Sequence, residues 1–246
     1  MKIAWSIEEE LVNSLDNTQE TAITVIIAAL NEEEGIGPTI AELKAALGEP
    51  VFLVVDGHSI DKTAEIARRM GARVLEQEGL GKGGAIEQAI THIDSGTDYV
   101  VFIDADFTYP AAFVPQMIGI LEETPEVGMV TGNRFNHKLR LSSMRSPYFI
   151  GNRFLAMTQR LLNGVKLRDP LTGLRVVRTR ILRDWTPKSR GFDVEAELNH
   201  LVEKRGYQTV EIPIEYRRRL GEKKLKLRDG FTILRRMLLE SLRSIA

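Results

Sequence analysis

The stretch YVVFIDADFTYP, residues 99–110, places two aspartates directly after an apolar run. The run has the length and composition of a strand buried on both faces, and residues i and i+2 of a strand point to the same side. Asp104 and Asp106 are therefore predicted to converge at the carboxyl end of a strand. Two such carboxylates can hold a hard divalent cation, Mg²⁺ or Mn²⁺. A solvated acidic turn is the plainer interpretation, but the position directly after YVVFI favours the functional one.

Outward from this strand, short apolar runs alternate with segments of helical period. Further strands are predicted at ITVIIAAL, VFLVV, ARVLEQ and VGMVTGNRF, and helices near residues 36–47, 61–70 and 84–94. Such alternation indicates a Rossmann-like α/β fold in which helices flank a mostly parallel sheet. Beyond residue 135 the pattern weakens to a segment near 147–163, a strand LRVVR, a helix near 193–205 and a strand YQTVEIPIEY.

The division of the chain follows from this pattern, since no repeat or linker interrupts it. We expect a single domain over residues 21–215, preceded by an extension, residues 1–20, that forms a short surface helix. Residues 216–246 form a basic segment with a net charge of +7, whereas the first 215 residues carry a net charge of -8. The third segment is thus predicted to be a basic appendage on an acidic body.

Composition limits the class of protein. The 246 residues include no cysteine, which excludes disulfides and thiolate chemistry. The longest apolar run, residues 22–30, is far shorter than the roughly 20 residues that a transmembrane helix needs. The N-terminus carries acids where a signal peptide would carry bases. We expect a cytoplasmic protein with no nucleic-acid partner.

Four polar segments follow the predicted strands, namely NEEEG at 31, DGHSIDKT at 56, GLGKGG at 79 and DADFTYP at 104. Ligands of parallel sheets bind at the carboxyl ends of strands, so these segments should share one edge. Asp56 could accept hydrogen bonds there from a nucleobase or ribose.

The segment GLGKGG has the glycine spacing of a dinucleotide fingerprint, yet it follows the third predicted strand rather than the first. A P-loop would have Ser or Thr where Gly83 stands. Lys82, among glycines at a helix start, suits a phosphate or the sugar attached to it. The alternative is a flexible glycine turn with a solvated lysine.

In order and spacing, these segments together with GNRF, RDPLTGLRVV, GFDVEAEL and RRRLGEKKLKLRDG resemble the family 2 glycosyltransferases of GT-A fold, over about residues 22–240. The chain looks most like the dolichyl- or polyprenyl-phosphate sugar synthases, in the short form without transmembrane helices. The resemblance implies divalent-metal-dependent transfer of a sugar, with inversion, from a nucleoside diphosphate sugar to a polyprenyl monophosphate. It implies a peripheral protein on the cytoplasmic face of a membrane that supplies lipid-linked sugar for glycosylation, and it leaves a homo-oligomer open.

The resemblance and the strand-end positions together assign the site residues. Catalysis is assigned to Asp104, Asp106, Arg134 and Arg145. The nucleotide-sugar site would comprise Ala28, Leu30, Asn31, Glu32, Asp56, Lys82, Asp104, Arg219 and Lys223 or Lys224. The acceptor phosphate would meet Arg134, Arg145, Asn152 and Asp169, and the metal would meet Asp104, Asp106 and Thr108.

Three positions depart from the family's pattern. Ala28 stands where a proline is usual, Gly57 where a second aspartate is commoner, and Thr108 where some members have a metal-binding glutamine. The donor therefore stays open among GDP-mannose, UDP-glucose and a UDP-N-acetylhexosamine.

A phosphate acceptor has a chemical consequence. A phosphate monoester has a second pKa near 6 and carries about -1.5 to -2 charge at pH 7, so no general base is needed to deprotonate it. Arg134 and Arg145 would align this nucleophile, and the metal would stabilise the leaving diphosphate. For this reason Asp193 and Glu195 are not assigned as a base.

The C-terminal segment has an apolar stripe at helical spacing, flanked by Arg235, Arg236 and Arg243; the stripe comprises Phe231, Leu234, Leu238, Leu242 and Ile245. Basic amphipathic helices can lie on anionic membranes, where a polyprenyl phosphate is found. The alternatives are packing on the protein's own core or on a partner subunit.

Three other functions fit parts of the sequence. GLGKGG by itself suggests a dinucleotide-dependent oxidoreductase, and the strand-end residues would also suit a nucleotide-sugar-binding module without turnover. The serious alternative is a family 2 glycosyltransferase with a hydroxyl acceptor, which makes a polysaccharide or glycolipid. Such an enzyme should need a carboxylate base near its acceptor.

Overall fold

The computed structural model describes residues 21–135, 147–222, 224, 226 and 228–245. Its centre is a seven-stranded sheet of order β3-β2-β1-β4-β6-β5-β7. The strands are β1 (Ile23–Ala29), β2 (Val51–Asp56), β3 (Arg73–Glu76), β4 (Tyr99–Phe102), β5 (Val127–Asn133), β6 (Arg175–Arg178) and β7 (Gln208–Pro213). Only β6 runs antiparallel to its neighbours, β4 and β5, so the predicted mostly parallel sheet is confirmed.

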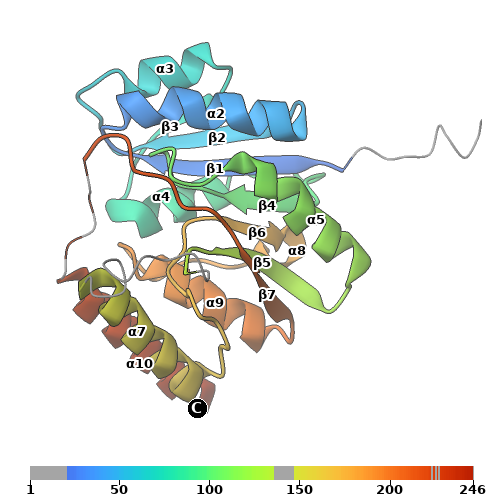
Figure 1. Ribbon diagram of the computed structural model, residues 1–246, viewed down its shortest axis with the longest axis vertical. Coiled ribbons are helices and arrows are strands. Elements are labelled where there is room, and N and C mark those ends of the chain that lie inside the picture. Colours follow the sequence, from blue (N-terminus) through green and yellow to red (C-terminus); the bar gives the residue numbers. More distant parts are fainter. Residues whose placement is uncertain (1–20, 136–146, 223, 225, 227, 246) are drawn as a thin grey trace, which may run out of the picture.

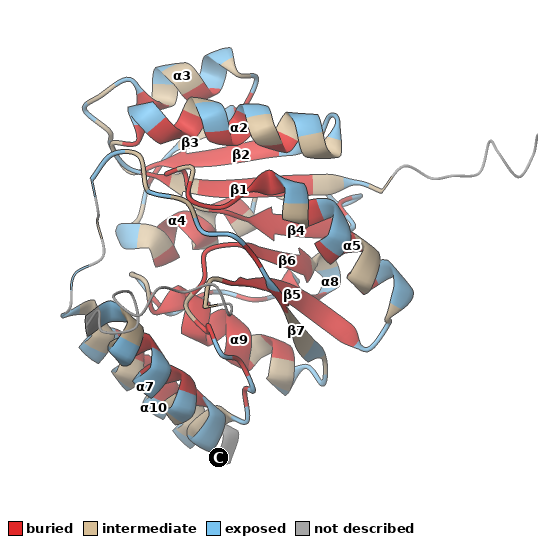
Figure 2. Cartoon of the chain, in the orientation of Figure 1, coloured by how far each residue is buried: buried red, intermediate tan, exposed pale blue. Residues whose placement is uncertain are grey.

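Helices cover both faces of the sheet (Figure 1). One face carries α2 (Glu33–Leu47), α3 (Thr63–Arg69), η1 (Ala111–Phe113) and α5 (Val114–Glu123), and the other carries α4 (Gly81–Ile90), α8 (Thr179–Leu182) and α9 (Val194–Lys204). A hydrophobic core lies on each face of the sheet. In β1, Val25 and Ile27 belong to the core beneath α2 and α5, and Ile26 belongs to the core beneath α4 and α9, as the strand period of two requires. Figure 2 shows the buried residues concentrated in the strands and on the inner sides of the helices.

Two further helices, α7 (Pro147–Asn163) and α10 (Asp229–Ile245), form a pair at one end of the molecule (Figure 1). They join α9 through a small apolar cluster of Leu155, Ala196, Ile233 and Met237. None of the helices in the described part of the chain is both long and apolar enough to cross a bilayer.

The element predictions hold with two exceptions. The segment 147–163 is helix α7, and the other predicted helices and strands are found with ends shifted by a few residues. Helices α5 and α8 are absent from the sequence prediction, although α5 buries Met117 and Leu121. The helix predicted within residues 1–20 lies outside the described residues. The boundary at residue 215 stays a prediction; Arg217, just beyond it, is paired with Glu42 on α2 at 2.6 Å.

Candidate active site

The carboxyl ends of the parallel strands bring the predicted residues to one edge of the sheet. Asp56 ends β2, Asp104 lies two residues after the end of β4, and Arg134 follows β5 directly. The segment 214–222, which follows β7, crosses this edge as a strap. It is tied there by the backbone N–H groups of Arg217 and Leu220, which donate to Thr108 O (3.0 Å) and Asp106 O (3.1 Å). The strap thereby delivers Arg219 to the two aspartates.

Four carboxylates share two cations at the centre of the edge. Lys82 Nζ lies 2.6 Å from Asp104 Oδ1 and 2.7 Å from Glu195 Oε1. Arg219 Nη1 lies 2.8 Å from Asp106 Oδ2, and its Nη2 donates to Glu32 Oε1. The opposite terminal oxygen of Glu32, Oε2, and Arg219 Nε are buried without a partner.

Burial and the neighbouring charges shift the pKa values of three carboxyl groups in this cluster. Burial raises the pKa of Glu32 to about 7 against the opposing effect of Arg219. Burial and the charge of Asp104 raise the pKa of Asp106. Burial would also raise the pKa of Asp104, but Lys82, with help from Arg134 and Arg219, lowers it overall. Of the two aspartates, Asp106 is thus the one whose charge is opposed by its neighbour, and a further cation beside it would counteract the effect of Asp104.

The oxygen donors here suit Mg²⁺ or Mn²⁺, which prefer carboxylate and phosphate oxygens. The unpartnered Glu32 Oε2 is an observation in favour of such a fit. Over residues 21–135 and the rest of the described chain, no group of three Asp, Glu, His or Cys side chains could hold a metal ion by itself. A cation at Asp104 and Asp106 would therefore need further oxygens from a ligand or water.

Thr108 lies behind Asp106. Its buried hydroxyl donates to Asp106 Oδ1 at 2.6 Å, and its backbone N–H donates to the same oxygen at 3.2 Å. These contacts fix the orientation of the Asp106 carboxylate. The assignment of Thr108 as a direct metal ligand stays a prediction.

The loops after β1 and β2 are tied to each other at the nucleotide side of the edge. Asn31 adopts a φ of 49° and donates from its backbone N to Ser59 Oγ at 2.8 Å. Asn31 Oδ1 accepts from the backbone N of Ile60 at 2.9 Å. Asp56 Oδ2 accepts from Ser59 N at 3.0 Å, whereas Asp56 Oδ1 is buried without a partner. One carboxylate oxygen of Asp56 is thus available to a ligand.

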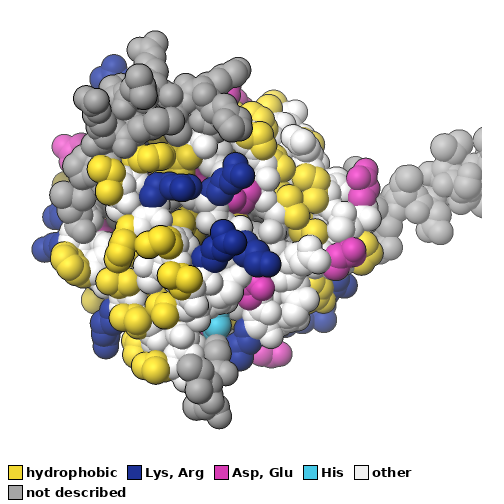
Figure 3. Space-filling model, turned by 60° about the horizontal axis from the view of Figure 1, so that its bottom comes forward, with side chains coloured by type: hydrophobic (Ala, Val, Ile, Leu, Met, Phe, Trp, Pro, Cys, Tyr) yellow, Lys and Arg dark blue, Asp and Glu magenta, His cyan; other side chains and the backbone are white. Residues whose placement is uncertain are grey.

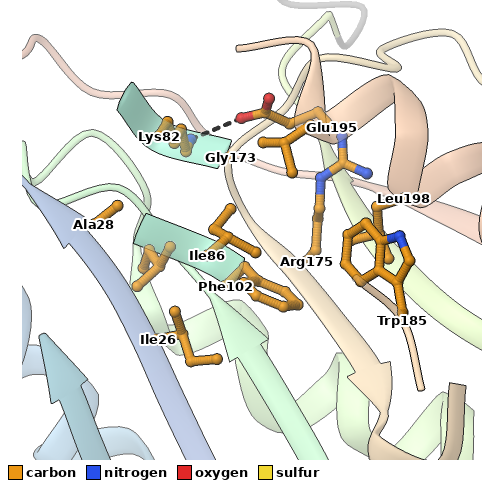
Figure 4. A pocket seen from close by; sticks show the side chains of 12 residues that line it. Ile26, Ala28, Lys82, Ile86, Phe102, Gly173, Arg175, Trp185, Glu195 and Leu198 are labelled. Carbon is orange, nitrogen blue, oxygen red and sulfur yellow. Dashed lines mark ion pairs between the residues drawn. The ribbon is translucent and has the colours of Figure 1, made fainter. Parts of the chain in front are cut away.

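The remaining residues assigned to the nucleotide side are placed less closely together. Leu30 is 42% exposed beside Asn31. Lys224 Nζ reaches Asn31 O at 3.4 Å, whereas Lys223 lies outside the described residues. Ala28 lines a cavity of about 20 Å³ beneath the Lys82–Glu195 pair, together with apolar side chains such as Ile86 and Phe102 (Figure 4).

The glycines of GLGKGG serve close packing. The backbone N of Gly83 donates to Arg190 O at 3.1 Å, and a Cβ on Gly83 would lie 2.1 Å from Ser189 O. The first turn of α4 can therefore approach the segment before α9 only with glycine there. Lys82 is largely buried in its two ion pairs, so the interpretation as a solvated lysine is wrong. Its contact with a phosphate or sugar stays a prediction.

On the acceptor side, Arg134 forms a two-pronged ion pair with Asp169. Arg134 Nε lies 2.7 Å from Oδ2 and Nη2 lies 2.8 Å from Oδ1, and the backbone N of Arg134 also donates to Oδ2 at 3.1 Å. Asp169 is fully buried. Asp169 thus orients the Arg134 guanidinium. Its assignment to the acceptor-phosphate site stays a prediction.

The other two residues assigned to the acceptor side are less well defined. Asn152 is buried on α7 with its Nδ2 unpartnered, and Arg145 lies outside the described residues. Their contact with an acceptor stays a prediction.

The three acids of GFDVEAEL all have partners within the protein. Asp193 accepts from Gly191 N at 3.0 Å and from Arg236 Nε at 3.3 Å, and Glu195 pairs with Lys82. Glu197 accepts from the backbone N of Lys188 and of Ser189, at 2.9 and 2.8 Å. Arg236, one of the arginines that flank the apolar stripe of α10, is buried in these contacts.

Two residues of the site were not singled out by sequence reasoning. A Cβ on Gly173 would lie 2.2 Å from Asp104 Oδ2, so only glycine leaves room for the Asp104 carboxylate. The backbone N of Gly173 donates to the buried Tyr109 hydroxyl at 2.7 Å. Tyr109 lies in DADFTYP and Gly173 in RDPLTGLRVV, two segments quoted above, but their contact joins residues 64 positions apart. Only the fold shows it.

Comparisons with known proteins identify relatives of this chain. A dolichyl-phosphate hexose transferase of Haloferax volcanii is 36% identical over 206 residues, which cover 82% of this chain and 86% of that protein. The glycosyltransferase AglJ of the same organism is 34% identical over 79% of this chain and 63% of its own length.

Among solved structures, that of glucosyl-3-phosphoglycerate synthase from Mycobacterium tuberculosis with uridine diphosphate matches with a TM-score of 0.69. It is 24% identical and covers 90% of this chain and 80% of that one, which shows the shared GT-A fold. The family model of glycosyl transferase family 2 matches residues 24–186, about two thirds of the sequence. This chain therefore belongs to glycosyl transferase family 2.

Proposed function

We propose that this glycosyltransferase transfers a hexose, with inversion, from a nucleoside diphosphate sugar to a polyprenyl monophosphate. The observation that carries the proposal is the Arg134 guanidinium, fixed by buried Asp169 at the same edge as Asp104. Arginine matches phosphate oxygens in charge and in geometry. The 36% identity to a dolichyl-phosphate hexose transferase supports the same acceptor class.

The donor would lie along the ends of β1, β2 and β4. Asp56 Oδ1, buried and unpartnered, would accept a hydrogen bond from the base or ribose. Asp104 and Asp106 would hold Mg²⁺ or Mn²⁺; when bound, such an ion stabilises the charge that develops on the leaving diphosphate. Arg219 on the strap, which pairs with Asp106 and Glu32, would contact the same phosphates. Structures of the glucosyl-3-phosphoglycerate synthase contain uridine diphosphate with Mn²⁺ or Mg²⁺, which supports this arrangement.

The acceptor requires little acid–base chemistry from the protein. A phosphate monoester is already largely ionised at neutral pH, so the chain has only to position it and neutralise part of its charge. Both carboxylate oxygens of Asp193 and of Glu197 accept hydrogen bonds within the protein, which agrees with a reaction that uses neither as a base.

A membrane surface would present this acceptor, and the α7–α10 pair offers a face to meet it. Exposed apolar side chains run along α7 at spacings of four, three and four residues: Ile150, Phe154, Met157 and Leu161. On α10, Phe231, Leu238 and Leu242 are also exposed, and the exposed Arg153, Arg160 and Arg235 lie among them. Figure 3 shows hydrophobic side chains gathered on one face with Lys and Arg beside them. We propose that this apolar face rests on the cytoplasmic surface of an anionic membrane.

The reaction is tested with purified protein, radiolabelled GDP- and UDP-sugars, and polyprenyl phosphate in detergent. We expect one donor to label the lipid phase, and we expect EDTA or Asp106→Asn to abolish the labelling. Asp98→Asn is the matched control, because Asp98 lies at the opposite end of β4 and accepts a hydrogen bond from Ala22 N. A donor that binds without ever labelling the lipid contradicts the acceptor assignment.

The membrane face is tested separately by sedimentation with vesicles that contain anionic lipid. Ile150→Ser with Leu161→Ser should reduce the bound fraction severalfold, because each buried apolar side chain is worth about 1.5–3 kcal/mol. Val51→Thr serves as the control, since Val51 is exposed at the amino edge of the sheet. If both variants sediment equally with the vesicles, the proposal that this face binds the membrane is contradicted.

One observation keeps a hydroxyl acceptor as the second candidate. Glu195 Oε2 is buried without a partner close to Asp104 and Lys82, and a free carboxylate oxygen could take a proton. Under this reading, Glu195→Gln abolishes transfer to a hydroxyl acceptor and leaves donor binding intact. Under the first proposal, transfer to polyprenyl phosphate persists in the same variant.

A further inference from the structure

The segment 168–173 is held from two sides by side chains of opposite charge. On one side, Glu211 of β7 accepts the backbone N–H groups of Arg168 and Asp169, at 2.8 Å each. On the other side, Arg175 of β6 donates from Nη2 to Pro170 O at 2.7 Å and from Nε to Thr172 O at 2.9 Å. An anion thus holds the donors of this segment and a cation holds its acceptors.

Arg175 is buried to an unusual degree for an arginine, with 1% of its surface exposed. Its third contact is from Nη1 to Asn199 Oδ1, at 2.5 Å. Asn199 donates in turn to Pro170 O at 2.9 Å and to Gln159 Oε1 at 3.0 Å. Among the ion pairs of the described residues, none contains Arg175. Burial of a cation on carbonyl oxygens alone is costly, and burial lowers the pKa of Arg175 accordingly.

The segment that Arg175 and Glu211 hold carries two contacts of the active site. Asp169, near its start, orients the Arg134 guanidinium. Gly173, at its end, leaves the space that the Asp104 carboxylate fills. Figure 4 shows Arg175 and Gly173 beside the Lys82–Glu195 pair. A shift of this segment would therefore displace Arg134 first, because Asp169 is that residue's ion-pair partner.

We propose that Arg175 and Glu211 are positioning residues for the acceptor phosphate: they fix the segment 168–173 so that Asp169 holds Arg134 where the phosphate binds. This inference rests on the proposed function, since it assigns Arg134 to the acceptor. Neither residue need touch the substrate. Their effect on the reaction is transmitted through Asp169 and through Leu171 O, which accepts from Arg134 Nη2 at 3.2 Å.

The chain contains a matched control on the same strand. Arg178 also donates to backbone carbonyls, from Nε to Val127 O at 2.8 Å and from Nη2 to Thr124 O at 3.3 Å. These carbonyls lie at the opposite edge of the sheet from Arg134. Arg175→Lys and Arg178→Lys each keep the charge and lose part of the carbonyl contacts, so a general loss of stability should affect both.

The experiment measures binding of geranyl monophosphate and of whichever of UDP and GDP the wild-type protein binds, by calorimetry, together with Tm. We expect Arg175→Lys to weaken the binding of geranyl monophosphate about tenfold, since a small misplacement of a binding group lowers affinity by that factor or more. Nucleotide affinity should fall less than acceptor affinity, because Asp106, Arg219 and Asp56 make no contact with the segment and only Asp104 meets it, through Gly173. Arg178→Lys should lower Tm and leave both affinities unchanged.

Glu211→Gln provides an independent variant if Arg175→Lys fails to fold. It should give the same selective loss to a smaller degree, about threefold, because the amide retains one acceptor oxygen. The inference is overturned if Arg175→Lys and Arg178→Lys lose geranyl monophosphate affinity equally. It is also overturned if neither Arg175→Lys nor Glu211→Gln loses that affinity. In both cases, binding of geranyl monophosphate by the wild-type protein would still support the proposed function. If the wild-type protein binds no geranyl monophosphate, both the inference and the proposed acceptor are contradicted.

Discussion

The two halves of the active site differ in how well their charges are paired. In the donor half, Glu32, Asp104, Asp106 and Glu195 share Lys82 and Arg219, and polar atoms of Glu32 and Arg219 are buried without partners. In the acceptor half, Arg134 and Asp169 satisfy each other through three hydrogen bonds. Segment 168–173 behind them is hydrogen-bonded on both sides.

The difference indicates which half is complete before substrates arrive. Buried polar groups without partners are costly, so their persistence in the donor half is consistent with a cation and a diphosphate that complete it. On the proposed acceptor side the Arg134–Asp169 pair is already formed, and Asn152 Nδ2 is buried without a partner among the described residues. We therefore expect donor-half variants to respond to metal and pH, and acceptor-half variants to respond to neither.

The largest effect should come from Asp106→Asn, which removes charge from the half that lacks a cation. Loss of metal-assisted catalysis is worth several kcal/mol, so we expect kcat to fall by about 10³-fold or more. Mn²⁺ affinity, followed by electron paramagnetic resonance, should fall in parallel. Retention of both metal affinity and activity would show that the donor half does not use this carboxylate.

Gly173→Ala tests the junction of the two halves. The added Cβ would lie 2.2 Å from Asp104 Oδ2, so either the carboxylate or the segment 168–173 must move. Misplacement by about an ångström can cost 10²-fold, and we expect a loss of that order in kcat/KM for donor and acceptor alike. Steady-state kinetics with each substrate varied in turn distinguishes this from damage to one half.

Arg134→Lys isolates the acceptor half, because lysine keeps the charge but cannot make the two-pronged contact with Asp169. Charge-assisted hydrogen bonds contribute about 1.5–3 kcal/mol, so the KM for polyprenyl phosphate should rise by about 10–100-fold. The KM for the donor should stay within about twofold. A larger change for the donor than for the acceptor would contradict the division of the site.

The smallest effect concerns Glu32, whose pKa is raised from its ordinary value of 4.5 to about 7. A carboxyl whose folded pKa is raised favours the folded state below its unfolded pKa, and this stability is lost as the pH rises through the folded value. Without metal, Tm should therefore decline by a few degrees between about pH 4.5 and 7. Glu32→Gln should flatten that decline in thermal scans. If Tm depends on pH in the same way in the wild type and in Glu32→Gln, the pKa of Glu32 is not raised in the folded protein.

Many of the site residues could be predicted because they follow strands directly. Asp56, Asp104 and Arg134 each come after an apolar run, and the parallel arrangement brings strand ends together without further information. Roles were harder to predict than positions. Asp169 and Lys82 were expected to bind phosphate, and in the fold each is engaged with oppositely charged side chains.

The contacts that sequence reasoning could not supply join distant positions. Arg219 reaches Glu32 across 187 residues and Asp106 across 113, because the strap crosses the edge of the sheet. The exposed stripe on α7 also could not be distinguished from an ordinary core-facing stripe. Both patterns have the period of a helix, and only packing against α9 and α10 decides which face is covered.

The sequence by itself determined the alternation of strands and helices, the edge at which ligands bind, and the ordered segments characteristic of the family. These properties are local, since periodicity and the residues at strand ends follow from the backbone geometry of short stretches. The tertiary structure alone decided which charges meet, which stay unpaired, and how Arg175 and Glu211 hold the segment beneath Arg134. Those properties depend on distances between side chains far apart in the sequence, which only the packed sheet and its crossing strap establish.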